Sequence, residues 1–332
     1  MKTATKNLTR RTTLALLASV AAAPVWAAGD QPLPAAFPRR PLTLIVPFSA
    51  GGPVDVLGRL LAQEYSARSG QTAIVENKTG GAGNIGIEIV RKAAPDGTTL
   101  LLIPAGNLTI NPTLMPNLTF DVERDFAPIT LLASAPNVLV VSPKLGVTSI
   151  KQLIEKARTT KLSYGSPGVG SQLHLAMELF KEKAGVEILH VPYRGSSQAL
   201  GDVLGDHIDV LATNLPAALP AIKGNLVVPL AMTTAQRSPL VPQVPTLEES
   251  GVAGIDVTSW YGMLAPRAIP NDVRDAIFAV TRDILEDTDL REKLLAQGLS
   301  VEIEPPQQFG ERIRKETALW SSVIKSRRIT IQ

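Results

Sequence analysis

Cysteine is absent from this sequence of 332 residues, and histidine occurs only three times. Without cysteine there is no disulfide framework, no thiolate nucleophile and no cysteine-based metal site. The histidines, His174, His190 and His207, lack the spacing of metal ligands, and Asp and Glu form no cluster suited to calcium. We therefore expect no metal site, and a chain of this length can bury a core large enough to do without disulfides.

Aromatic residues and long apolar runs are also scarce. Aromatic side chains make up 4% of the chain against 45% for all hydrophobic residues, which is the composition of a globular protein with an aliphatic core. The apolar run at residues 14–23 is too short to span a bilayer comfortably. It follows a basic stretch and precedes the small-residue site Val25-Trp26-Ala27, so residues 1–27 are predicted to be an export signal cleaved near Ala27. The pair Arg10-Arg11 leaves the twin-arginine export route open.

Positive charge is concentrated in that first segment. Residues 1–27 carry four basic and no acidic side chains, so cleavage would lower the formal net charge from +3 to −1. The basic isoelectric point is therefore no argument for a nucleic-acid partner.

The rest of the chain is organised around residues 42–62, which predict a buried strand, a tight loop and a helix. The strand is short, apolar and rich in β-branched residues, and Pro47 ends it. The loop from Ser49 to Gly52 has almost no side-chain bulk, and Pro53 suits the first helical turn. Unpaired N–H groups at such a helix start form a socket for an anion, here without a lysine or arginine. The alternative is an ordinary strand-to-helix turn.

The remaining pattern alternates strands and helices, which predicts parallel sheets with right-handed crossovers. The first lobe continues with strands at 72–76 and 99–103 around a helix at 85–94, and residues 111–126 are expected to be irregular. A strand at 137–142 and a capping box at Ser149-Ile150-Lys151-Gln152 come next. The opening pattern then returns, with strands at 162–164, 188–191, 207–212 and 227–232 and helices at 171–184, 197–204 and 216–223. The end of the chain is predicted to be mostly helical, at 271–286, 289–296 and 306–325.

Two glycine-rich motifs resemble nucleotide-binding loops but lack essential parts. The stretch from Gly81 to Gly86 reads G-x-G-x-x-G, yet it follows the second strand, and the acidic residue expected after the next strand is missing. The loop from Gly165 to Ser171 has the glycine spacing of a P-loop but no lysine to neutralise a phosphate. We therefore expect no cofactor.

Ser171 and His174 lie three residues apart on a predicted helix and so share one face. A serine hydrolase would use Ser171 as nucleophile, His174 as base and Asp209 to orient the base. No G-x-S-x-G sequence surrounds Ser171, however, and this serine stands where a helix N-cap belongs. We therefore predict no catalytic residue and keep the hydrolase as the less favoured alternative.

The motifs taken together resemble a known family. They are Pro47-Phe48-x-x-Gly51-Gly52-x-x-Asp55, Glu76-Asn77-x-x-Gly80-x-x-Gly83-Asn84-Ile85-Gly86, Ala94-Pro95-Asp96-Gly97, Tyr164-Gly165-Ser166-x-Gly168-x-Gly170-Ser171-x-x-His174-Leu175, His190-Val191-Pro192-Tyr193-Arg194-Gly195-Ser196, Leu204-Gly205-Asp206-x-Ile208-Asp209-Val210 and Pro245-Thr246. In register over nearly the whole mature chain, they resemble the Bug (TctC-like) family of periplasmic substrate-binding proteins of tripartite tricarboxylate transporters.

The resemblance implies an α/β fold of the two-lobe Venus-flytrap kind, the type II class of periplasmic binding proteins. Each lobe would be a mostly parallel sheet flanked by helices. Residues 28–136 and 258–332 would form the first lobe and residues 137–257 the second, with crossings near 135–138 and 256–261.

The resemblance also implies a ligand carboxylate held by the two glycine-rich loops, largely through backbone amides, small hydroxyls and bridging waters. The implied ligand-binding residues are Phe48, Gly51, Gly52, Asp55, Asn84, Gly106, Asn107, Ser166, Gly168, Gly170, Ser171, His174, Tyr193 and Asp209. Asp55 could instead complement the helix dipole, and Tyr193 and Asp209 could be core or strand-end residues.

The implied function is to capture a small carboxylate in the periplasm for delivery to the membrane subunits of a transporter, as a monomer and without chemistry on the ligand. A sensor that feeds a two-component signalling system is the alternative within the same architecture. Few of the candidate residues are cationic, with Arg194 the only arginine in a motif, which favours small mono- or dicarboxylates over citrate.

Overall fold

A computed structural model describes residues 33–115, 117–326 and 329–330 of the chain. The predicted export signal, residues 1–27, lies outside the described residues. Within the described ranges, no helix combines the length and the apolar character needed to cross a membrane.

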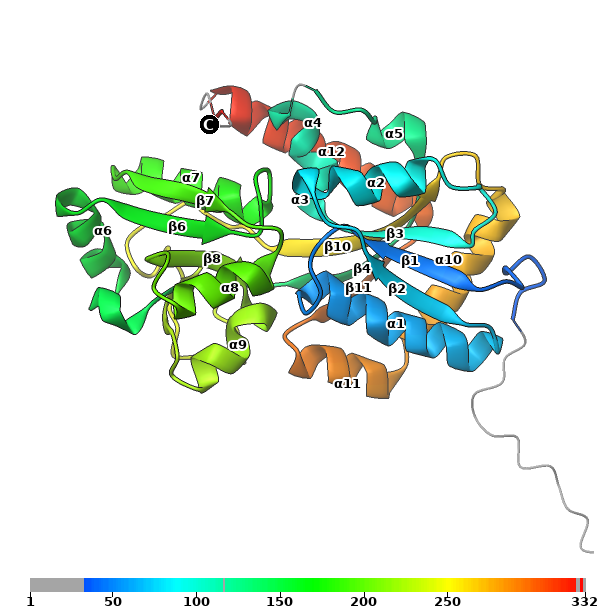
Figure 1. Cartoon of the computed structure of the whole chain (residues 1–332), viewed down its shortest axis with the longest axis horizontal. Coiled ribbons are helices and arrows are strands. Elements are labelled where there is room, and N and C mark those ends of the chain that lie inside the picture. Colours follow the sequence, from blue (N-terminus) through cyan, green and yellow to red (C-terminus); the bar gives the residue numbers. More distant parts are fainter. Residues whose placement is uncertain (1–32, 116, 327–328, 331–332) are drawn as a thin grey trace, which may run out of the picture. The chain divides into compact units, whose positions relative to one another are not determined.

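The first sheet contains six strands in the order β11-β4-β10-β3-β1-β2 (Figure 1). Its parallel half consists of β1 (Leu42–Val46) between β2 (Ala73–Asn77) and β3 (Thr99–Pro104), as the sequence predicts. The other half is antiparallel. Here β10 (Ser259–Pro266) pairs with β3 and with β4 (Phe126–Ala135), and β11 (Ser300–Glu304) pairs with β4.

Both faces of this sheet are buried. Along β1, Leu44 and Val46 belong to one apolar cluster and Ile45 to another, because successive side chains of a strand point to opposite faces. The first cluster is completed by helices α1 (Pro53–Ser69), α10 (Asn271–Leu285) and α11 (Thr288–Ala296), and the second by α2 (Asn84–Arg91), α3 (Ala105–Thr109) and α12 (Pro306–Ser326). The prediction of a first strand that is covered on both faces is confirmed.

The second sheet contains five strands in the order β7-β6-β8-β5-β9. The strand β6 (Leu162–Ser166) runs parallel to β7 (Ile188–Pro192) and β8 (Val210–Asn214), whereas β5 (Asn137–Val141) is antiparallel to β8 and β9 (Val228–Met232). Helices α6 (Ile150–Thr159) and α7 (Gln172–Ala184) pack on one face, and α8 (Ser196–Leu204) and α9 (Leu215–Lys223) on the other. The two-lobe α/β fold is therefore confirmed, with sheets that are mixed rather than mostly parallel.

The chain passes between the two sheets twice, at adjacent points. Only Pro136 separates β4 from β5, and the return leads from Val257 to the start of β10 at Ser259. The side chain of Asn137 joins the two passages. Its Nδ2 donates to the Val257 carbonyl at 2.9 Å, and its Oδ1 accepts a hydrogen bond from Ser259 Oγ at 2.9 Å.

The last helix, α12, contributes to the cores of both sheets. Phe309 and Ile313 join the second cluster of the first sheet, whereas Trp320 and Ile324 join the cluster that contains α6 and α7. A helix of 21 residues is about 30 Å long, enough to reach both. The end of α12 thus packs with the second sheet, although the sequence groups residues 258–332 with the first.

The sequence analysis did not predict three strands of the first sheet, namely β4, β10 and β11. Every residue of β10 is buried, so it shows no alternation of polar and apolar residues, and β11 is too weakly apolar to be seen. The stretch expected to be irregular holds the single-turn helices α4 (Asn111–Leu114) and α5 (Val122–Asp125). Short 3₁₀ turns occur at Gly81–Gly83 and Pro143–Leu145, and β8 begins three residues later than predicted.

Candidate functional site

A cavity lies between loops that follow strands of both sheets. The first sheet contributes the loop before α1 and the start of α3, and the second contributes the loop before α7, the start of α8 and the end of β8. The space open to the centre of a water molecule is about 50 Å³. The cavity therefore suits a small molecule rather than a macromolecular segment.

Three helices begin at this cavity. Pro53 and Val54 of α1, Gln172 and Leu173 of α7, and Ser196 of α8 all line it. The first amides of a helix have no acceptor within the helix, and the positive end of the helix dipole lies behind them. The three helix starts therefore give the cavity a positive potential that does not depend on side chains.

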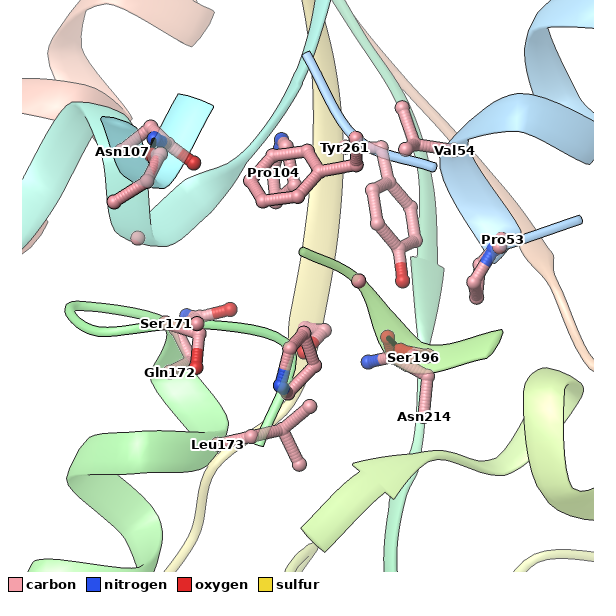
Figure 2. A pocket seen from close by; sticks show the side chains of 18 of the residues that line it. Pro53, Val54, Pro104, Asn107, Ser171, Gln172, Leu173, Ser196, Asn214 and Tyr261 are labelled. Carbon is pink, nitrogen blue, oxygen red and sulfur yellow. Dashed lines mark hydrogen bonds between the residues drawn. The ribbon is translucent and has the colours of Figure 1, made fainter. Parts of the chain in front are cut away.

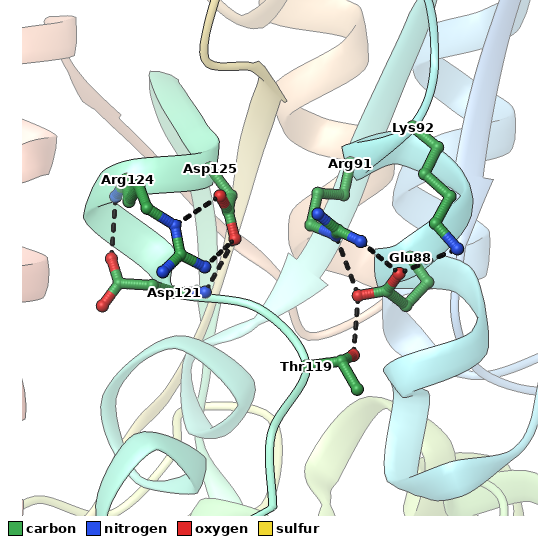
Figure 3. Close-up of polar contacts among 7 residues, drawn as sticks. All are labelled: Glu88, Arg91, Lys92, Thr119, Asp121, Arg124 and Asp125. Atoms are coloured by element: carbon green, nitrogen blue, oxygen red, sulfur yellow. Dashed lines mark hydrogen bonds and ion pairs between the residues drawn. The ribbon is translucent and has the colours of Figure 1, made fainter.

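Charged side chains are missing from the lining of the cavity, within the part of the chain that the structure describes. Charges pair elsewhere, as Figure 3 shows for α2 and α5. There Glu88 accepts hydrogen bonds from Arg91 at 2.9 Å and from Thr119 at 2.7 Å, and the bonds from Arg91 lower the pKa of Glu88 to about 2. An anion in the cavity would thus meet helix ends and hydroxyl groups rather than an ion-pair partner.

Six polar side chains that were not predicted to bind the ligand also line the cavity. They are Ser49, Gln172, Ser196, Asn214, Ser259 and Tyr261. Figure 2 shows Tyr261 reaching from strand β10 with its hydroxyl toward Ser196 and Asn214. Ser196 lies in a motif quoted above, which could have indicated it. Asn214 is the last residue of β8, and ligands of α/β sheets bind at the carboxyl ends of strands, so its position could have indicated it. Nothing in the local sequence marks Tyr261.

The loop before α1 is held by a charged group. Asp55 accepts hydrogen bonds from the Gly51 amide, Arg59 Nε and Asn77 Nδ2, each at 2.9 Å. Asn77 Nδ2 also donates to the Phe48 carbonyl at 3.0 Å. Burial alone would raise the pKa of Asp55, but the hydrogen bonds outweigh it and hold the pKa below its usual value. The carboxylate thus fixes the loop without lining the cavity.

The loop before α7 is held by neutral histidines. The Gly170 amide donates to His174 Nδ1 at 3.3 Å, and His190 Nε2 lies 2.7 Å from Ser166 Oγ. Ser166 Oγ also accepts from the Gly168 amide at 3.2 Å. Burial, aided by Lys181, lowers the pKa of His174 to about 4. Burial and the neighbouring His174 lower that of His190 to about 3. Both rings are therefore neutral near pH 7.

The loops of the two sheets touch beside the cavity. A Cβ atom on Gly106 would lie 2.4 Å from the Gly170 carbonyl oxygen, so only glycine allows this approach. Gly170 has φ +74° and packs against Asn111. On the other side the Ser49 amide donates to the Arg194 carbonyl at 3.1 Å. Arg194 thus contributes its backbone to the contact, and its side chain does not line the cavity.

The structure brings six of the fourteen predicted residues together at the cavity, namely Phe48, Gly52, Gly106, Asn107, Gly168 and Ser171. The other eight, Gly51, Asp55, Asn84, Ser166, Gly170, His174, Tyr193 and Asp209, do not line it. Tyr193 donates to Asp202 Oδ2 at 2.7 Å, and Asp209 accepts from the amide and hydroxyl of Ser163 at 2.8 and 3.0 Å. These bonds fit the structural roles that the sequence left open for Tyr193 and Asp209.

Comparison with known proteins decides the family. A family model described as "Tripartite tricarboxylate transporter family receptor" matches residues 57–329. The chain belongs to this family. Its members are receptors, as the description says, and the resemblance drawn from the motifs is confirmed.

Three relatives show how far the similarity extends. Protein BugT of Bordetella pertussis (strain Tohama I) is 34% identical over 292 residues, which cover 87% of this chain and 90% of BugT. The structure of R. palustris Rpa4515 with adipate has a TM-score of 0.84 and 36% identity, over 87% of this chain and 97% of that chain. The structure of MatC (Rpa3494) from Rhodopseudomonas palustris with bound malate has a TM-score of 0.82 and 29% identity, over 87% of this chain and 100% of that chain.

In this member of the family, the groups of the alternative hydrolase triad have other partners. Ser171 Oγ accepts a hydrogen bond from the His174 amide at 3.1 Å and so caps α7, as predicted. His174 Nδ1 accepts from Gly170, and Asp209 is bonded to Ser163. No group of three metal-binding side chains occurs among residues 33–115, 117–326 and 329–330.

Proposed function

We propose that this receptor is periplasmic, binds a small mono- or dicarboxylate in the cavity and delivers it to the membrane subunits of a transporter. The observation that carries the proposal is the meeting of α1, α7 and α8 at a cavity without a charged side chain. Each helix start is equivalent to roughly half a positive charge, which suits one or two carboxylates. Two similar structures contain ligands of this class, Rpa4515 with adipate and MatC with bound malate.

The same observation disfavours citrate. Three carboxylates would need more positive charge than helix ends supply, and no cationic side chain lines the described cavity. In this proposal residues 28–136 with 258–332 and residues 137–257 are the two lobes, which close on the ligand about Pro136 and the return passage at 257–258.

A thermal-shift screen of succinate, L-malate, adipate and citrate tests the binding. A ligand at one hundred times its Kd should stabilise the protein by about 2.7 kcal/mol. The fully methylated esters of the same acids, dimethyl for the diacids and trimethyl for citrate, are the matched control, because they keep the carbon chain and lose the charge. If an ester stabilises the protein as much as its acid, or no acid stabilises it, the proposal is wrong.

Delivery requires a cell experiment. A strain that lacks the gene should lose uptake of the radiolabelled acid identified in the screen, and the wild-type gene should restore it. Intact uptake together with a lost transcriptional response to the acid would instead support the signalling alternative. A variant without residues 1–27 should fail to restore uptake, because the protein would stay inside the cell.

A further inference from the structure

The four tyrosines of the chain differ in what their hydroxyl groups contact. The hydroxyl of Tyr65 pairs with Thr281, that of Tyr164 donates to Glu178 at 2.7 Å, and that of Tyr193 donates to Asp202 at 2.7 Å. The hydroxyl of Tyr261 is buried and has no hydrogen-bond partner among the described residues. Tyr261 is therefore the exception that needs an explanation.

The fold delivers this hydroxyl to the cavity. Tyr261 lies on β10, opposite Pro104 of β3 and Ala133 of β4, and its pairing with β4 is irregular between Tyr261 and Gly262. Irregular pairing of this kind re-aims side chains near functional sites. Only 2% of Tyr261 is exposed because its ring packs in the core of the first sheet, yet the residue lines the cavity. In Figure 2 its hydroxyl points into the space beside Pro53 and Ser196.

The polar groups around this hydroxyl are bonded to one another or unpaired, and none of them is bonded to it. Ser196 Oγ lies 3.3 Å from Asn214 Oδ1, and Asn214 Nδ2 donates to Asn137 Oδ1 at 2.7 Å. Burial raises the pKa of Tyr261, so the hydroxyl keeps its proton and can donate it. A buried donor without an acceptor costs about 1–3 kcal/mol. The cavity is the direction from which an acceptor can reach it.

We propose that the Tyr261 hydroxyl is the side-chain donor that fixes a carboxylate of the ligand where α1 and α8 begin. This assignment rests on the proposed function and deepens it by naming the group that selects a carboxylate at this end of the cavity. The carboxylate accepts from Tyr261 and lies before the positive ends of both helices, so an anion is favoured over a neutral acceptor.

Tyr261→Phe tests the assignment, with Tyr65→Phe as the matched control. Both changes remove one buried hydroxyl, and Tyr65 lies away from the cavity with its hydroxyl bonded to Thr281. Isothermal titration with L-malate and adipate should show affinity about 10- to 100-fold weaker for Tyr261→Phe, the usual worth of a hydrogen bond to a charged group. Tyr65→Phe should bind like the wild type.

The ligand-free proteins provide a second measurement. Tyr261→Phe removes an unpaired donor, so its melting temperature should equal or exceed that of the wild type, whereas Tyr65→Phe breaks a bond and should melt lower. If Tyr261→Phe binds both acids normally while the wild type binds them, the assignment alone is wrong. Tyr261→Phe could instead melt at a lower temperature than the wild type and lose no more affinity than this loss of stability explains. In that case the role of Tyr261 is structural and the assignment is again wrong. If the wild type binds neither acid, both the proposed function and the assignment fail.

Discussion

The two loops that frame the cavity have the same local design but different supports. Each follows a parallel strand, contains glycines and leads into a helix whose start lines the cavity. The loop before α1 is held by the Asp55 carboxylate with Arg59 and Asn77, and the loop before α7 by the neutral rings of His174 and His190. One local pattern therefore does not fix how a loop responds to pH, because the side chains that support the two loops differ in charge and in pKa.

The comparison extends to the glycines. Gly52 has φ −80°, which any residue can adopt, and a Cβ there would meet nothing closer than 3.6 Å. The backbone of the first loop therefore does not require glycine at this position, although a side chain would enter the cavity. Gly168 has φ +148°, so the second loop requires glycine for its conformation as well as for space.

The largest expected effect comes from filling the cavity. Gly52→Val should raise the Kd for the bound acid by at least about 100-fold, or about 2.8 kcal/mol, with little change in unfolding free energy. Gly168→Val should also weaken binding, but it should destabilise the fold by about 1–3 kcal/mol because of the strained φ. Titration calorimetry and urea unfolding measure the two effects.

Gly201→Val is the control for both variants. Gly201 is exposed on α8, where a Cβ would have no neighbour within 4 Å. Normal binding by Gly52→Val would mean that the ligand does not approach the first loop closely.

The second-largest effect is on the pH dependence of the unfolding free energy. It distinguishes the histidines that support the loop before α7 from Asp55, which supports the loop before α1. The pKa values of His174 and His190 are lowered to about 4 and about 3 from 6.5, so the unfolded chain takes up protons that the folded chain does not. The unfolding free energy should therefore fall as pH drops from 6.5 toward 4, by about 1.4 kcal/mol per pH unit for each histidine. The pKa of Asp55 is lowered below 3.8, so protonation of Asp55 should reduce the unfolding free energy only at lower pH.

His174→Asn isolates this contribution, because the amide oxygen can accept from Gly170 and does not titrate. Urea unfolding at intervals between pH 7 and pH 4 should show a smaller slope for this variant. An unchanged slope in His174→Asn would show that the second loop does not depend on the neutral ring.

The smallest effect concerns the cap of α7. Ser171→Ala removes the acceptor of the His174 amide and should lower the unfolding free energy by about 1 kcal/mol. Affinity for the acid should fall by less than about tenfold, since one hydroxyl is lost from the lining. Chemical denaturation and calorimetry measure both. An esterase activity of the wild type that disappears in Ser171→Ala would instead revive the hydrolase alternative.

Motifs predicted more of the site than local reasoning about side chains did. Phe48, Gly52, Gly168 and Ser171 line the cavity because loops at the ends of strands meet there, a rule that is readable from the order of elements. His174 and Asp209 are in the right motifs, yet their side chains support the second loop and the start of β6. Which way a side chain points depends on the packing of its helix or strand, and one sequence does not show this.

The sequence by itself determined the class of this protein. The hydrophobic pattern predicted the parallel strands around β1 and β6 and the helices that cover them, and the motifs predicted the family, which comparison confirmed. Only the tertiary structure decided the place of Tyr261. Its neighbours Pro53, Ser196 and Asn214 are far from it in the chain, and burial of both sheet faces, together with the antiparallel entry of β10, brings them to one cavity. Contacts of that range depend on how whole elements pack, which no local pattern encodes.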